Sequence, residues 1–228
     1  MDELLLAYET GIHLGDGNLY ETPRMQRMTY SGNLENEKDF YKKILFKILQ
    51  DLFNVKPLYY ERETDNSVLL VINSKTLVEF KKSIGLTAGN KTNIRIPEFI
   101  RNNGKLLKRC LSGLGDTDFS VSFKKNRKGA YVEPRMELFC NSRMLAKDIS
   151  DALKKFEFTS SFEETKRRNF NEFRIRMYGK RNLEKWINEI GFKNPYILTK
   201  INFWKKFGYF VPRQNYSYYV RLLASASG

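Results

Sequence analysis

The stretch "CLSGLGDTDFSVSF" (Cys110–Phe123) dominates our expectation of the architecture, because an apolar helix-like run ends on acidic residues and continues directly as a strand-like alternation. A second segment, "AYETGIHLGDGNLY" (Ala7–Tyr20), has the same features in the same order. Asp16 and Asp118 hold matching places in the two segments. A helix-to-strand junction that recurs in this way indicates an internal repeat.

Two further pairs of segments keep the same order along the chain. The stretch "RMTYSGN" (27–33) matches "RMELFCN" (135–141), and "KTLVEFKKSIG" (75–85) matches "RNLEKWINEIG" (181–191). The ordered set predicts a duplicated α+β domain in which each half runs αββαββα. We expect an N-terminal half over 1–86, a linker over 87–104, and a C-terminal half over 105–228 that ends with an extra helix.

The hydrophobic periodicity and the turn residues place the elements within each half. The expected helices cover 3–15, 35–53, 74–85, 104–116, 142–156 and 180–190. The expected strands cover 18–23, 25–31, 57–63, 67–73, 119–127, 131–140, 158–166 and 170–178. Asn33 precedes the second helix and suits its N-cap. The last residues, "ASASG", are expected to be disordered.

The composition points to a polyanionic partner. The 228 residues include 40 Lys and Arg against 26 Asp and Glu, a net charge of +14, which is more than solubility requires. No apolar run approaches the roughly 18 residues of a membrane span, and the start "MDELLLAYETG" is acidic where a signal peptide is basic. We therefore expect an intracellular protein, cytoplasmic with the nucleoid or in an organellar matrix, without membrane contact.

The cysteine and histidine content excludes several classes. Cys110 and Cys140 lie in apolar patterns and are interpreted as reduced core thiols. His13 is the single histidine, so zinc fingers and His-rich nuclease sites lack their ligands. We expect His13 to be a packed or surface residue.

Small residues recur one turn apart before each acidic helix end. Gly11 and Gly15 correspond to Gly113 and Thr117, which would let the two helix backbones approach closely. The approach would place Asp16 beside Asp118. Two neighbouring carboxylates resist ionising together unless a cation lies between them, and a site of carboxylate, carbonyl and phosphate oxygens suits Mg²⁺.

These segments resemble the paired motifs of the LAGLIDADG homing endonucleases, in their single-chain, intron-encoded form. "ETGIHLGDG" (Glu9–Gly17) aligns as the first copy and "LSGLGDTDF" (Leu111–Phe119) as the second. The resemblance implies that the last acid of each motif, Asp16 or Asp118, binds metal and acts in catalysis. Asp116 has Leu14 opposite it and is interpreted as structural. Phe119 stands where the first copy has Gly17, and would be strained if the position needs a positive φ.

The resemblance also implies two antiparallel saddle-shaped sheets with the motif helices packed at the centre of a monomer. The expected reaction is a staggered double-strand break in a long, asymmetric double-stranded DNA target, supported by Mg²⁺ or Mn²⁺, with Ca²⁺ as a substitute that does not support cleavage. Gly15 and Thr117 would offer backbone carbonyls to the metal ions. Lys75 and Lys180, at the starts of the third helices, are candidates for the peripheral basic residues of the two sites.

Strand alternation predicts which side chains face DNA in the major groove. Residues of apolar type on the same strands are expected to face the core, as Met28, Val121 and Ile175 do in the pattern. The outward set is Arg27, Thr29, Arg62, Ser120, Ser122, Lys124, Asn126, Arg135, Glu137, Arg174 and Arg176. The basic runs "KKNRK" (124–128) and "KRRN" (166–169) are expected at hairpin tips, where they would follow phosphates.

Two alternatives remain on the same fold. The first is a maturase that binds intron RNA and assists splicing without cutting DNA. The second is a catalytically silent DNA-binding protein, against which the presence of both Asp16 and Asp118 counts.

Overall fold

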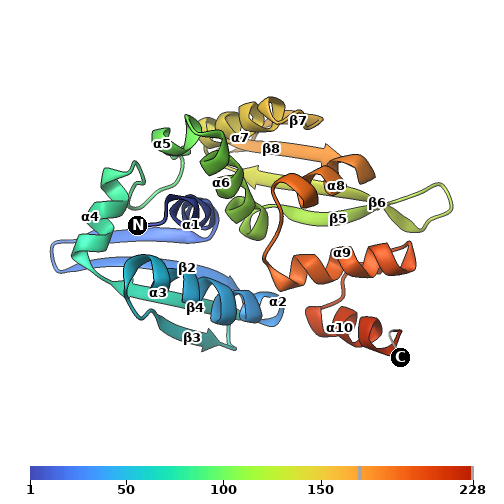
Figure 1. The fold of residues 1–228 in the computed structure, drawn as a ribbon, viewed down its shortest axis with the longest axis horizontal. Coiled ribbons are helices and arrows are strands. Elements are labelled where there is room, and N and C mark those ends of the chain that lie inside the picture. The colour runs from blue at the N-terminus through green and yellow to red at the C-terminus, as the bar shows by residue number, and fades with distance from the viewer. Residues whose placement is uncertain (169–170, 227–228) are drawn as a thin grey trace.

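The computed structural model describes residues 1–168 and 171–226, which form two similar halves joined through helices α1 (Glu3–Gly15) and α6 (Gly104–Thr117). Figure 1 shows these helices side by side at the centre, with the strands of one half on each side. The duplicated α+β architecture predicted from the sequence is confirmed.

The first half follows α1 with a four-stranded antiparallel sheet in the order β1-β2-β4-β3. Its elements are β1 (Gly17–Thr22), β2 (Met25–Asn33), α2 (Leu34–Asp39), the π-helical turn η1 (Phe40–Leu45), α3 (Phe46–Phe53), β3 (Leu58–Arg62), β4 (Ser67–Asn73) and α4 (Lys75–Ser83). The expected Asn33 cap is present, since its side chain accepts a hydrogen bond from the Asn36 N–H at 3.0 Å.

The second half repeats the same topology in the order β5-β6-β8-β7. After α6 come β5 (Ser120–Lys125), β6 (Tyr131–Cys140), α7 (Arg143–Lys155), β7 (Ser160–Lys166), β8 (Asn171–Tyr178) and α8 (Gly179–Glu189). The predicted strand that began at residue 170 and the end of the 166–169 run include residues 169–170, which lie outside the described residues.

The alternation along the strands separates the core from the outer face as predicted. One face of each sheet packs under the helices of its half and is fully or nearly fully buried. Its members include Leu19, Met28, Tyr30, Leu70, Ile72, Val121, Phe123, Met136, Leu138, Phe173, Ile175 and Met177. Among the described residues, no helix of the same half covers the opposite face of either sheet.

The C-terminal segment differs from the expectation. The predicted last helix is α9 (Pro195–Phe207), and a further helix, α10 (Tyr216–Ser225), follows it. Asn215 caps α10 by accepting a hydrogen bond from the Tyr218 N–H at 3.0 Å, so the start of "ASASG" is helical and not disordered. The expected linker also contains a short helix, α5 (Glu98–Arg101).

The sequence also led to predictions about the cysteines, about membrane-spanning helices and about the limits of the two halves. Both cysteines are free thiols, and Cys110 is fully buried, as predicted. Among the helices described, none combines the length and the apolar character needed to cross a membrane. The limits of the two halves at residues 86 and 105 stay a prediction.

Candidate functional site

Backbone contact between α1 and α6 brings the two motif ends together. A Cβ atom added at Gly11 would overlap the Cys110 carbonyl oxygen, and one at Gly113 would overlap the Tyr8 carbonyl oxygen. At such short separations only glycine fits. The predicted small-residue contact between the motif helices is therefore confirmed.

Asp16 and Asp118 follow the last residues of α1 and α6 and lie at the same spot. A Cβ on Gly15 would be 3.1 Å from Asp118 Oδ1, so this carboxylate touches the end of the opposite helix. Burial raises the pKa of Asp118 to about 6. Burial also raises the pKa of Asp16 well above its usual value, with repulsion from Glu37 and Asp118 adding to the shift. A crowded acidic pair of this kind calls for a nearby cation.

Lys91 supplies a positive charge at the acidic pair. Its Nζ donates hydrogen bonds to three carbonyl oxygens at the end of α1, those of Gly15 (2.6 Å), Leu14 (3.1 Å) and His13 (3.3 Å). Burial lowers the pKa of Lys91, and attraction to the two aspartates opposes that shift. The ammonium group therefore compensates both the helix-end carbonyls and the acids.

Lys91 was not predicted as a site residue, because it lies in the linker, outside every periodic element. A lysine also follows the third helix of the second half, Lys193, but it lies two residues after Gly191 whereas Lys91 lies six residues after Gly85. Lys193 extends elsewhere, with its Nζ 4.3 Å from the centre of the Tyr8 ring.

The two acids differ in their immediate partners. The Tyr41 hydroxyl donates a hydrogen bond to Asp16 Oδ2 at 2.8 Å. In the described part of the chain, no side chain makes the corresponding bond to Asp118. Glu37 lies on the Asp16 side and accepts a hydrogen bond from the Asn33 N–H at 2.7 Å. The two halves of the site are therefore similar in outline and different in detail.

Asp116 has the structural role predicted for it. Its carboxylate accepts hydrogen bonds from the Lys193 and Asn194 N–H groups, both at 2.9 Å, and from the Tyr8 hydroxyl at 2.6 Å. It thereby fixes the segment before α9 to both motif helices.

The exchange of Gly17 for Phe119 is explained by packing, and the suggested positive φ was wrong. Neither residue is in the left-handed region. A Cβ at Gly17 would lie 2.6 Å from the Cα of His13, whereas the matching helix position in the second copy is Gly115. Gly115 leaves room for Trp186, on which the Phe119 ring packs at 5.2 Å. Large and small residues have exchanged places, and His13 is a buried core residue, as expected.

Lys75 and Lys180 are not brought to the acids, which corrects their assignment. Their side chains are 69% and 68% exposed, and they pair with Glu79 and Glu184 one turn along their own helices. Lys91 contacts the site instead.

The oxygen atoms at this site fit a hard divalent cation that would take its remaining ligands from water and substrate. Within residues 1–168 and 171–226, no three His, Cys, Asp or Glu side chains are grouped to hold a metal by themselves. The protein offers the carboxylates of Asp16 and Asp118 and the Gly15 carbonyl. Thr117 could add its carbonyl; its hydroxyl donates a hydrogen bond to Gly113 O at 3.1 Å. Mg²⁺ is commonly held by one or two carboxylates plus phosphate oxygens.

The outward residues predicted on the first sheet lie on its open face. Arg27 is half-buried and its Nε donates to Asn73 Oδ1 at 2.9 Å. Thr29 is half-buried beside it, and Arg62 is exposed near Asp65. On the second sheet, Ser120 and Lys124 are exposed and Ser122 is half-buried.

Glu137 lies on the outward face as predicted but is covered by other side chains, and Asn126 is not placed as predicted. Glu137 is only 4% exposed, because its carboxylate binds the guanidinium groups of Arg135, Arg174 and Arg176. Asn126 lies beyond the end of β5 after a bulge at Lys124, and its side chain accepts hydrogen bonds from backbone N–H groups of the hairpin turn. Neither side chain is free for a base edge in this arrangement.

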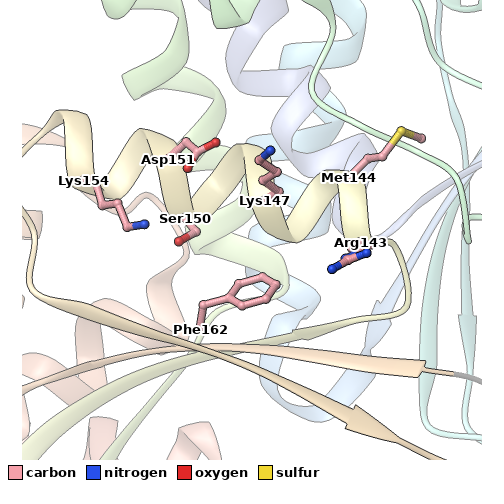
Figure 2. A pocket seen from close by; sticks show the side chains of 7 residues that line it. All are labelled: Arg143, Met144, Lys147, Ser150, Asp151, Lys154 and Phe162. Carbon is pink, nitrogen blue, oxygen red and sulfur yellow. The ribbon is translucent and has the colours of Figure 1, made fainter.

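A separate hollow of about 540 Å³ lies between α7 and β7, on the helix side of the second sheet. Figure 2 shows the Phe162 ring beneath α7, with Arg143, Lys147 and Lys154 on the helix. Neither acid lines it. The hollow is therefore not part of the acidic site.

Comparison with known proteins shows which solved structures share this fold. Residues 106–191 match the model of the LAGLIDADG-like domain. The homing endonuclease I-DmoI in complex with DNA and Ca superposes with a TM-score of 0.61, at 17% identity, over 88% of this chain and 97% of that chain. I-WcaI bound to its DNA recognition sequence gives a TM-score of 0.53 at 14% identity over 86% and 83%. Residues 106–191 therefore resemble a LAGLIDADG-like domain, and the described chain has the fold seen in the homing endonucleases I-DmoI and I-WcaI.

Other proteins that resemble this chain have names unlike those of the homing endonucleases. The N-terminal LAGLIDADG domain of DUF199/WhiA matches with a TM-score of 0.53, at 12% identity, over 84% of each chain. Two curated proteins are each 24% identical: a tRNA-splicing ligase RtcB of Methanopyrus kandleri, over 82% of this chain, and a replication factor C small subunit of Thermococcus kodakarensis, over 83%. The chain spans only 20% of the length of each of these two relatives.

Proposed function

We propose that this protein is a site-specific DNA endonuclease that makes a staggered double-strand break by metal-assisted phosphodiester hydrolysis. The observation that carries the proposal is the meeting of Asp16 and Asp118, with Lys91, at the ends of two helices in backbone contact. Each acid is followed directly by a strand of an open sheet, so a duplex on the sheets would present its phosphates to the acids.

Asp16, Asp118 and the Gly15 carbonyl would hold the metal ions. Bound there, Mg²⁺ or Mn²⁺ would polarise the scissile phosphate, activate water and stabilise the leaving oxygen. The similar structures of I-DmoI were obtained with DNA and Mn or Ca, which supports the same choice of cation here.

The chain's own residues prepare the site before DNA arrives. Tyr41 fixes the orientation of the Asp16 carboxylate through its hydrogen bond of 2.8 Å. Lys91 lowers the electrostatic repulsion between the two acids and would offset the charge of an incoming phosphate. Asp116 anchors the α6 end, so Asp118 is held on a fixed element.

The curated relatives support a function that is independent of the host protein. A segment like this chain occupies a fifth of two longer proteins with different names. A module that occurs in unrelated hosts is expected to act on something other than the substrates of those hosts.

The test uses a plasmid library with a randomised insert, since the target cannot be read from the chain. Incubation with Mg²⁺ should linearise a subset of plasmids at one sequence, and EDTA should prevent this. The Asp16→Asn, Asp118→Asn double variant is the matched control and should leave the same plasmids uncut. An intact library, together with tight binding of structured intron RNA, would contradict the endonuclease and favour the maturase.

A further inference from the structure

The two sheets have the same topology, but the outer faces differ in composition. Their rows of residues can be compared because Asn18 and Ser120 each stand two residues after the proposed acid of their half. The antiparallel registers then define the row that runs across each sheet from these two residues.

Matching rows contain different residue types. On the first sheet the row from Asn18 continues through Thr29, Val71 and Leu58. On the second sheet the row from Ser120 continues through Glu137, Arg176 and Ser161. In the neighbouring row, Ser31, Leu69 and Tyr60 of the first sheet correspond to Phe139, Arg174 and Glu163 of the second.

The first face is an apolar surface bordered by arginines. Leu58 and Tyr60 are 48% and 47% exposed, and they line a hollow of about 250 Å³ together with Val71. Arg27 and Arg62 also line this hollow. Exposed apolar side chains grouped in this way indicate a contact surface. The thymine C5-methyl is the apolar group that bases display in the major groove.

The second face is a network of charges held in place. Arg176 donates from Nε to Glu137 at 2.8 Å and pairs with Glu163 at 2.8 Å. The Arg174 guanidinium lies 4.6 Å from the centre of the Phe139 ring. Buried Glu137 fixes the arginines, so they lose little side-chain freedom on binding. The two terminal nitrogens of Arg176 pair with Glu163, which is 44% exposed, and one of them also donates to the Tyr178 hydroxyl at 3.3 Å. Guanine O6 and N7 are acceptors that could replace Glu163 there while Glu137 keeps its hold on Nε.

We propose that the two halves recognise their half-sites by different chemistry: the first sheet reads thymine methyl groups by apolar contact, and the second reads guanines through Arg174 and Arg176. This inference rests on the proposed function, since it requires that the open faces bind duplex DNA. The half-sites of the target are then unlike each other, with thymines in one and guanines in the other.

The experiment begins with duplexes selected from a randomised library in Ca²⁺. In the selected duplex, thymines are replaced by uracil and guanines by 7-deazaguanine, one half-site at a time, and affinity is measured by titration. Uracil should weaken binding about 4-fold for each contacted methyl, in one half-site only. Loss of N7 should weaken binding about 5-fold or more, in the other half-site only.

Two variants assign these effects to the sheets. The Leu58→Ala, Tyr60→Ala double variant should no longer distinguish thymine from uracil, while it keeps its preference for guanine over 7-deazaguanine. Arg176→Lys keeps the charge but loses the planar fork, so it should lose the preference for guanine over 7-deazaguanine at one contacted guanine and keep the preference for thymine. Met144→Ala removes an equally exposed apolar side chain on α7 and should keep both preferences.

Two outcomes would overturn the inference and can be told apart from a failure of the proposed function. Both analogues acting in the same half-site would contradict it, and so would a double variant that still prefers thymine to uracil. A library from which no duplex is selected would overturn the proposed function and this inference together.

Discussion

The contact between α1 and α6 predicts that Gly113→Ala destabilises the protein. In an isolated helix the same change is stabilising by about 1 kcal/mol, because alanine has the higher helix propensity. Here the new Cβ would overlap the Tyr8 carbonyl oxygen and lie 2.8 Å from the Ile12 nitrogen. Both atoms belong to the α1 backbone, so no side chain can rotate away and the helices must separate.

The size of the effect follows from these opposing contributions. Overpacking of a well-packed core costs about 1–3 kcal/mol, and contact with backbone atoms places this case at the upper end. After subtracting the propensity gain, we expect a loss of about 2 kcal/mol. In a chain of this size that lowers Tm by about 4–8 °C. Because the separation also moves Asp118 away from Asp16, cleavage should fall even where the variant stays folded.

The assay is urea and thermal unfolding of the variant beside a matched control. Gly104→Ala lies at the start of the same helix, where a Cβ would meet nothing within 4 Å. The control should be neutral or stabilised by up to about 1 kcal/mol. Equal stability of the two variants would show that the helices are not in backbone contact, and the geometry of the acidic site would then be wrong.

Three further predictions concern residues around the site. Asp116→Asn should lower the free energy of unfolding by about 2 kcal/mol, since charge-assisted hydrogen bonds from two N–H groups and a hydroxyl are weakened; an unchanged urea midpoint would contradict this structural role. Burial holds the pKa of His13 well below 6.5, so below that pH the unfolded chain binds a proton that the folded chain does not, and the free energy of unfolding decreases by up to about 1.4 kcal/mol for each unit by which the pH is lowered. His13→Gln should remove this contribution. The check is the slope of the unfolding free energy against pH between about 7.5 and about 5.5, roughly one unit either side of the ordinary imidazole pKa. Identical slopes for the two proteins would refute the prediction. Lys91→Met should slow single-turnover cleavage by about 100-fold, while Lys75→Met, an exposed control, should cut normally.

The parts of the fold that were predictable from sequence are those set by periodicity and repetition. Alternation placed Met28 and Val121 in the core, and the repeated helix-to-strand junction placed Asp16 opposite Asp118. Asn33 was recognisable as a cap because its side chain competes for helix N–H groups in a known way. These features depend on local sequence and on one comparison between two halves.

The parts that were missed depend on contacts between distant segments. Lys91 acts from the linker, and its role is visible only when the linker crosses the end of α1. Glu137 alternates outward as predicted, yet three arginines from two strands cover it. Lys75 was predicted as a site residue because it begins a helix, but that position does not determine where its long side chain points. The large side chain at Phe119 is explained only by its contact with Trp186, which is distant in sequence.

The most direct test of the acidic pair is to measure which strand of the selected duplex each single variant cleaves. With Mg²⁺, the native protein should cut both strands, Asp16→Asn should cut only one, and Asp118→Asn should cut only the other. Each variant should still bind the duplex in Ca²⁺ with affinity near that of the native protein. Cleavage of both strands by either variant would contradict the assignment of one acid to each cut.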